Sequence, residues 1–176
     1  TVITALTAQN TQGVDAVYNI ESSFIEKQIK SVSSDLDISH IKIGMLSNLE
    51  IMKTVNDCIL KYLPDVPIIL DTVMVAKGGH RLLEKNSINY LLKNIIPKSY
   101  LITPNIPEAE EILGFELNNL SDMKKGINKF REKGISRVLL KGGHLKLKEK
   151  KIYDFLIDND NTFIFESMLI ETLNTH

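Results

Sequence analysis

The sequence predicts an α/β fold with a mainly parallel sheet flanked by helices. Short β-branched runs alternate with longer segments whose apolar residues recur at helical spacing, which is the pattern of consecutive β-α-β units. Near the C-terminus, two strand-like runs flank a short polar turn and add an antiparallel edge hairpin. With 176 residues, 43% of them hydrophobic and 24% charged, residues 1–176 are expected to form a single domain with one core.

The expected strands are short apolar runs rich in β-branched residues. In chain order they are Val2–Thr7, Val14–Tyr18, Ile41–Met45, Pro67–Asp71, Tyr100–Thr103 and Arg137–Lys141. The hairpin follows, with strands at Ile152–Ile157 and Thr162–Phe165 joined by the turn Asp158–Asn161.

Helices are expected between these strands, because apolar side chains fall on one helical face in each segment. The ranges are Ser22–Ser33, Asn48–Leu63, Lys85–Ile95, Pro107–Leu113 and Asp122–Lys133. Pro97 is expected to end the third helix, and Gly114 the fourth, which opens with a proline. Ser121 is expected to cap the fifth helix and Gly134 to end it.

Composition excludes several classes of function. The chain has 21 basic and 22 acidic residues and a net charge of −1, so no overall field recommends nucleic acid or an anionic membrane as partner. No uninterrupted apolar run reaches the roughly 18 residues of a membrane span. The single cysteine, Cys58, excludes an intramolecular disulfide and favours the cytoplasm, and it is expected to be a core residue. A secreted protein without disulfides remains open.

Polar and glycine-bearing turns follow most of the predicted strands. They are Gln9–Thr11, Gly44–Met45, Asp71–Met74, Thr103–Asn105 and Lys141–His144. In open α/β sheets, ligands bind at the carboxyl ends of the strands. We therefore expect these turns to gather at one edge of the sheet and to form one small-molecule cleft.

Two carboxylates at these turns are candidate metal ligands. Asp71 ends an apolar strand, where it is placed to hold a hydrated divalent cation, although a helix cap or a loop aspartate is the simpler interpretation from its position alone. Asn105 and Glu108 lie at the start of a predicted helix. A glutamate is favoured there by the helix dipole alone, so a structural role also remains open.

Lys141, Gly142 and Gly143 join a cation to two glycines, which allows an ammonium and backbone N–H groups to approach a phosphate. An ordinary glycine turn is the alternative, since no Walker motif occurs, and His144 is expected to be a turn residue. The second glycine pair, in Lys77–His80, is either a flap over the site or a surface loop. The run from Lys146 to Lys151 is expected to be a solvated loop.

Gln9 is a candidate for reading a substrate. Its amide can pair with the ring nitrogen and the exocyclic amine of an aminopyrimidine, or with adenine, whereas a loop hydrogen bond is the simpler interpretation. Met45 and Val73 can form apolar walls around a flat ring, unless they pack in the core.

Six motifs occur in a fixed order along the chain: TALTAQNT, IKIGML, ILDTVMVAK, LITPNIPEA, VLLKGGH and NTH. This order resembles that of the phosphomethylpyrimidine kinases of the ribokinase-like superfamily, from Thr1 to His176. The resemblance implies a ribokinase-like fold and a homodimer. It also implies MgATP as the phosphoryl donor. The implied acceptor is 4-amino-5-hydroxymethyl-2-methylpyrimidine, then its monophosphate, in thiamine biosynthesis.

The same resemblance implies roles for individual residues. It implies substrate contact for Gln9, Met45 and Val73, magnesium binding for Asp71 and Glu108, and nucleotide contact for Asn105, Lys141 and Thr175.

The chain also departs from the family pattern. Family members usually begin with a glycine-rich segment, approximately AGSDxxGGAGIQAD, and continue from NTH into GTG[CD], which supplies the anion hole and the base. Both elements are expected to lie outside Thr1–His176, so no catalytic base is expected within the chain, and the chain alone is expected to be a poor catalyst. Pyridoxal kinase activity and a non-catalytic pyrimidine-binding fragment are the alternatives.

Overall fold

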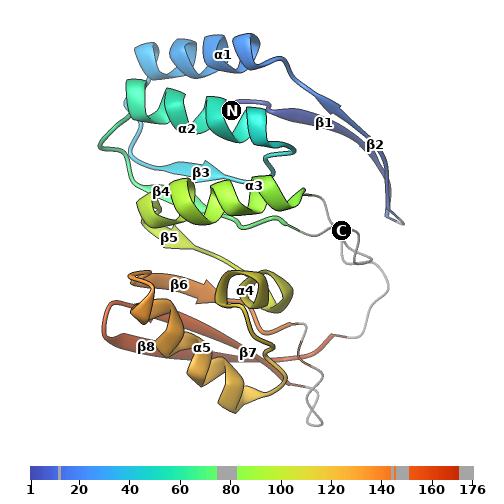
Figure 1. The fold of residues 1–176 in the computed structure, drawn as a ribbon, viewed down its shortest axis with the longest axis vertical. Coiled ribbons are helices and arrows are strands. Elements are labelled where there is room, and N and C mark those ends of the chain that lie inside the picture. Colours follow the sequence, from blue (N-terminus) through green and yellow to red (C-terminus); the bar gives the residue numbers. More distant parts are fainter. Residues whose placement is uncertain (12, 75–82, 144, 146–150, 171–176) are drawn as a thin grey trace.

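A computed structural model describes residues 1–11, 13–74, 83–143, 145 and 151–170. Its main sheet has six strands in the order β3-β4-β5-β6-β7-β8, and Figure 1 shows them along the body of the molecule. The strands are β3 (Ile41–Ile43), β4 (Ile68–Leu70), β5 (Leu101–Ile102), β6 (Arg137–Leu140), β7 (Lys151–Asp158) and β8 (Asn161–Met168).

The first four strands of this sheet run parallel, and β7 and β8 add the antiparallel hairpin. In the parallel part, Ile43 pairs with Leu70, Leu70 with Ile102, and Ile102 with Val138. The mainly parallel sheet and its C-terminal antiparallel edge are therefore confirmed. The register also brings the carboxyl ends of β4, β5 and β6 side by side.

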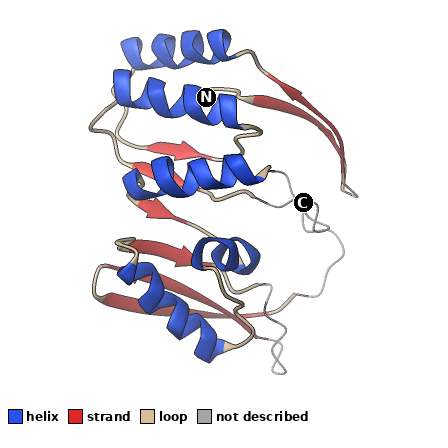
Figure 2. Cartoon of the chain, viewed as in Figure 1, coloured by secondary structure: helices blue, strands red, loops and turns tan. Residues whose placement is uncertain are grey.

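The first two strands, β1 (Ala5–Gln9) and β2 (Val14–Asn19), form a separate antiparallel ribbon. Figure 2 shows this ribbon apart from the main sheet. The expectation that these two strands belong to the main sheet is wrong, whereas the place of the Gln9–Thr11 turn beside the cleft stays a prediction. The connection between the two strands is too short for a parallel crossover, which needs about a dozen residues or more, so the chain turns back on itself.

The expected helices are all present, with ends shifted by one or a few residues. They are α1 (Ser22–Asp35), α2 (Leu49–Tyr62), α3 (Lys85–Tyr90), α4 (Ile106–Leu113) and α5 (Leu120–Glu132). The helix that starts with α3 continues through a π-helical turn at Leu91–Ile95 and a 3-10 turn at Ile96–Lys98. Gly114 follows α4 with a φ of 82°, the left-handed conformation that favours glycine. None of the helices in the described part of the chain has the length and apolar character needed to cross a bilayer.

The core lies between the sheet and its helices. Its most deeply buried side chains include those of Leu70, Ile102, Val138, Leu140, Phe155, Ile157, Met52, Met123 and Phe130. Cys58 on α2 is also buried, and this burial raises the pKa of its thiol. The interpretation of Cys58 as a core residue is therefore confirmed.

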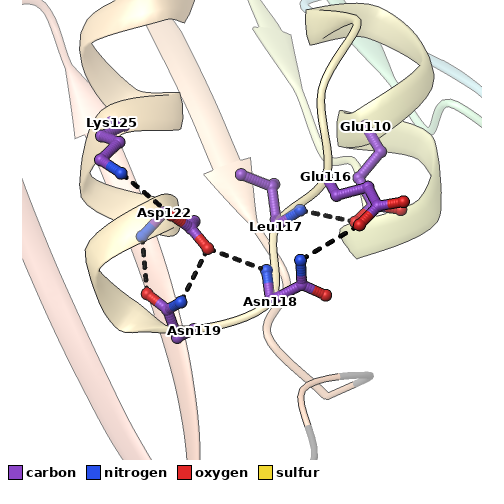
Figure 3. Close-up of polar contacts among 7 residues, drawn as sticks. All are labelled: Glu110, Glu116, Leu117, Asn118, Asn119, Asp122 and Lys125. Atoms are coloured by element: carbon purple, nitrogen blue, oxygen red, sulfur yellow. Dashed lines mark hydrogen bonds and ion pairs between the residues drawn. The ribbon is translucent and has the colours of Figure 1, made fainter.

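The N-terminus of α5 is capped by Asn119, and the expectation that Ser121 caps it is wrong. Asn119 has an extended backbone, and its side-chain oxygen accepts a hydrogen bond of 3.0 Å from the backbone N–H of Asp122. The Asp122 carboxylate in turn accepts from the Asn118 backbone N–H at 3.3 Å and from the Asn119 side-chain amide at 2.8 Å. Figure 3 shows these contacts. Ser121 already lies inside the helix, so its hydroxyl cannot serve as the cap.

Replacing Asn119 by alanine is expected to lower the free energy of unfolding by about 1 kcal/mol, since the first turn of α5 loses its side-chain acceptor. Ser121→Ala is the matched control and is expected to change stability by less than about 0.5 kcal/mol. Urea denaturation of both variants measures the difference. Equal losses in the two variants would show that the cap does not depend on Asn119.

Candidate active site

At the ends of three neighbouring strands, two side chains contact the carboxylate oxygen of a third. Asp71 follows β4, Thr103 follows β5, and Lys141 follows β6. The Thr103 hydroxyl donates to Asp71 Oδ1 at 3.0 Å, and Lys141 Nζ lies 3.1 Å from the same oxygen. The side chains of Asp71 and Lys141 remain 31% and 39% exposed, so a ligand can reach this pair.

A second carboxylate, that of Glu108, is buried next to this group. Its Oε2 accepts hydrogen bonds of 2.9 Å from both the Asn105 backbone N–H and the Thr72 hydroxyl. Asn105 returns a contact, because its side-chain oxygen accepts from the Glu108 backbone N–H at 3.0 Å. This reciprocal pair is a capping box at the start of α4 and fixes the orientation of the glutamate.

The backbone joins the two carboxylates into one cluster. Asp71 and Thr72 are consecutive, and Lys141 forms an isolated parallel β-bridge with Asn105. The Lys141 backbone N–H also donates to the Pro104 carbonyl at 2.8 Å. The structure therefore brings together Asp71, Glu108, Asn105 and Lys141. Their roles in binding metal and nucleotide stay predictions.

The predicted substrate residues come from the ribbon and from the segments after β3 and β4. Gln9 is exposed on the β1–β2 ribbon. Met45 is half-buried after β3, and its carbonyl accepts a hydrogen bond from the Thr4 hydroxyl at 3.1 Å. Val73 is half-buried after β4. No hydrogen bond or ion pair between described residues links Gln9, Met45 or Val73 side chains to the carboxylate cluster, so their proposed grouping around a ring stays a prediction.

Other predicted features fall outside the described residues. They are Thr175, His144, the whole Lys77–His80 segment and residues 146–150 of the basic run. The last residue of that run, Lys151, is not in a loop but begins β7 and forms an ion pair of 2.7 Å with Glu166.

A cavity of about 510 Å³ lies between the N-terminal segment, α1, α2 and β3. Among the predicted site residues that the structure describes, only Met45 lines it. The cavity runs along β3 at the edge of the main sheet, whereas the carboxylate cluster lies at the ends of β4, β5 and β6. It is therefore a feature distinct from the cluster.

The carboxylate cluster fits a magnesium ion that is shared with a phosphate ligand. Within the described residues, no group of three or more His, Cys, Asp or Glu side chains is arranged to hold a metal. Magnesium does not need such a cage, because it keeps several waters and commonly binds one or two carboxylates together with substrate phosphates. Asp71 and Glu108 can supply the protein's part of that set, with Lys141 as the neighbouring cation.

Sequence reasoning missed the contacts that orient these groups. Thr72 and Thr103 stand within the predicted turns, and each hydroxyl donates to one of the two carboxylates. Asp154 on β7 was missed as well, and its Oδ1 accepts from the Gly142 backbone N–H at 2.8 Å. No periodicity or spacing signals a contact of this kind, which depends on how β6 and β7 pair.

The comparison with known proteins agrees with the geometry. The sequence model described as phosphomethylpyrimidine kinase matches residues 1–176. The chain belongs to this family. Among its relatives, the hydroxymethylpyrimidine/phosphomethylpyrimidine kinase of Bacillus subtilis is 38% identical over 174 residues, which cover 99% of the chain and 64% of the relative. The enzyme of the same name from Escherichia coli is 39% identical over 176 residues, with 99% and 65% covered.

A bifunctional relative contains a similar segment. The thiamine biosynthesis bifunctional protein ThiED of Geobacter sulfurreducens is 36% identical over 175 residues, which cover 99% of the chain and 35% of the relative. The chain thus spans slightly less than two thirds of the length of the two kinases above, and about a third of this larger protein.

Solved structures of kinases share the fold. The phosphomethylpyrimidine kinase of Clostridium difficile superposes with a TM-score of 0.83 at 41% identity, covering 94% of the chain and 70% of that structure. The pyridoxal kinase of Bacillus subtilis, solved as an ADP complex, gives a TM-score of 0.82 at 27% identity, with 97% and 64% covered. The ribokinase-like fold implied by the sequence resemblance is confirmed.

Proposed function

We propose that the protein containing this chain phosphorylates 4-amino-5-hydroxymethyl-2-methylpyrimidine and then its monophosphate, with ATP as donor and magnesium as cofactor. The observation that carries the proposal is the meeting of Asp71, Lys141 and Thr103 beside the fixed carboxylate of Glu108. This combination of carboxylates and an ammonium suits a ligand that brings phosphates and a divalent cation together. Membership of the phosphomethylpyrimidine kinase family supports the choice of reaction.

Phosphoryl transfer depends on positioning and on neutralising the charge at the transferred group. Magnesium, when bound, supplies part of that neutralisation. Asp71 and Glu108 hold the cation, and Lys141 and Asn105 face the phosphates. Thr175, outside the described residues, is proposed to contact the nucleotide as well.

The acceptor site is proposed to involve the β1–β2 ribbon. Gln9 pairs its side-chain amide with the pyrimidine, while Met45 and Val73 cover the ring. A homodimer and a cytoplasmic location complete the proposal, on the sequence grounds given above.

Pyridoxal is the second candidate acceptor, because kinases solved with pyridoxal share the fold: one from Staphylococcus aureus gives a TM-score of 0.78 at 28% identity. We expect the full-length protein with MgATP to show a higher kcat/KM for the hydroxymethylpyrimidine than for pyridoxal. Gln9→Leu is expected to reduce this preference, because leucine cannot pair with the aminopyrimidine. Coupled measurement of ADP release gives both rates.

A higher kcat/KM for pyridoxal would replace the proposed acceptor. Binding of the pyrimidine in calorimetry without turnover of either acceptor would instead identify a non-catalytic binding protein. Asp71→Asn serves as the chemical control and is expected to lower kcat by about 100-fold or more for any acceptor, since it weakens the proposed site for the magnesium ion that neutralises the transferred phosphate.

A further inference from the structure

Within the described part of the chain, two side chains contact Asp71, and both reach its Oδ1. One donor, the Thr103 hydroxyl at 3.0 Å, is neutral, and the other, Lys141 Nζ at 3.1 Å, carries a full positive charge. The ion pair is about a third exposed on each side. Pairs of this exposure are weakly held and are readily exchanged for another partner.

The two members of this ion pair are proposed to bind different ligands. Asp71 is assigned to the magnesium ion and Lys141 to the nucleotide phosphates. An ammonium at 3.1 Å from Asp71 Oδ1 neutralises the carboxylate and repels a divalent cation that approaches it. Lys141 and magnesium are therefore competitors for Asp71.

The structure allows Lys141 to leave without disturbing the sheet. Its backbone is fixed by the bridge to Asn105 and by the hydrogen bond to the Pro104 carbonyl, so only the long side chain needs to move. The Thr103 hydroxyl comes from another strand end and continues to hold Asp71 when the ammonium has gone. Glu108 differs, because its partners are the buried Thr72 hydroxyl and a backbone N–H.

We propose that Lys141 acts as a stand-in cation for Asp71 and that nucleotide binding exchanges it for magnesium. In the nucleotide-free protein, the ammonium neutralises Asp71. The phosphates then draw the ammonium to themselves, and the released carboxylate takes the metal, with Thr103 as its positioning residue. This exchange rests on the proposed function and makes nucleotide and metal binding cooperative.

The first test measures Mn²⁺, a spectroscopic substitute for Mg²⁺, by electron paramagnetic resonance on the full-length protein without nucleotide. Lys141→Met is expected to tighten Mn²⁺ binding about two- to fivefold, the range of an exposed ion pair. Lys129→Met is the matched control, because Lys129 also pairs with a carboxylate, that of Glu132 at 2.7 Å, on the exposed side of α5. Unchanged or weaker Mn²⁺ binding in Lys141→Met would overturn the exchange.

Thr103→Val in the Lys141→Met protein provides a second variant. The loss of the Thr103 hydroxyl, the other described donor to Asp71, is expected to remove the gain in Mn²⁺ affinity, while the thermal unfolding midpoint reports any loss of fold. Retention of the full gain would overturn the positioning role of Thr103.

The second test separates exchange from simple charge repulsion. Calorimetry with ATP in excess chelator measures metal-free ATP affinity in four proteins: the wild type, Asp71→Asn, Lys141→Met and the double variant. The gain in affinity caused by Asp71→Asn is then compared with Lys141 present and with Lys141 replaced. The exchange predicts a larger gain in ATP affinity when Lys141 is present, because the released ammonium can then bind phosphate. Equal gains with and without Lys141 would show that Asp71→Asn acts only by removing repulsion between the carboxylate and the phosphates, and this would overturn the exchange. Absence of both ATP and Mn²⁺ binding in the wild-type protein would instead overturn the proposed function.

Discussion

Gly142→Ala is expected to destabilise the protein by about 3 kcal/mol. A Cβ at this position would overlap the carbonyl oxygen of Tyr153 and approach its carbonyl carbon to 3.0 Å. Both atoms belong to the backbone of β7, so no side-chain rotation relieves the clash. The hydrogen bond from the Gly142 backbone N–H to the Asp154 carboxylate would also lengthen as β7 moves away from Gly142. The free energy of unfolding from urea denaturation of the full-length protein measures the loss.

Gly143→Ala is the matched control, because a Cβ at this neighbouring position meets no atom of the described residues within 4 Å. Its expected effect on the free energy of unfolding is less than about 0.5 kcal/mol. Similar losses for the two variants would show that the turn as a whole, rather than the close approach of β7, requires glycine.

The structure thus gives Gly142 a packing role that the sequence did not reveal. The glycine pair after Lys141 suggested backbone N–H groups that approach a phosphate. In the fold, the Gly142 N–H already donates to the Asp154 carboxylate, and the missing side chain admits the backbone of Tyr153. Both contacts arise from the pairing of β6 with β7, which spacing along the chain does not encode.

The fold itself was largely predictable because hydrophobic periodicity reports which face of each element is buried. Hydrophobic periodicity does not show as clearly which strands pair with each other. The apolar pattern of Val14–Tyr18 predicted a strand correctly, yet only the shortness of its connection to β1 indicates that the two strands pair with each other. Gln9 is carried by that ribbon, so its strand is not part of the main sheet.

The carboxylate cluster was predictable in outline for a different reason. Parallel strands end at the same edge of a sheet, so long side chains directly after β4 and β6 can meet across the end of β5, which lies between them. Asp71 and Lys141 meet in this way. The hydroxyls of Thr72 and Thr103 could not be singled out, since threonine is common in strands and only the folded chain shows which hydroxyl faces a carboxylate.

Glu108→Ala is expected to lower the free energy of unfolding by about 2–3 kcal/mol, because it removes the acceptor of two donors at once. The Thr72 hydroxyl is fully buried and would lose its partner, and the Asn105 N–H would lose the second half of the capping box. Lys124→Ala, at an exposed position of α5, is the control and is expected to cost less than about 0.5 kcal/mol.

Glu108→Gln separates the structural role of this residue from its proposed metal role. Glutamine also suits position N3 of a capping box, and its carbonyl oxygen can accept from the Thr72 hydroxyl and the Asn105 backbone N–H. The free energy of unfolding is therefore expected to fall by less than about 1 kcal/mol. The negative charge is lost, however, and Mn²⁺ affinity in the presence of ATP is expected to fall by about tenfold or more, since magnesium-type ions prefer carboxylate oxygens. Paired urea denaturation and paramagnetic resonance measure the two effects on one preparation. Unchanged Mn²⁺ affinity in a stable Glu108→Gln protein would assign Glu108 to the helix cap alone and leave Asp71 as the single proposed protein ligand of the metal.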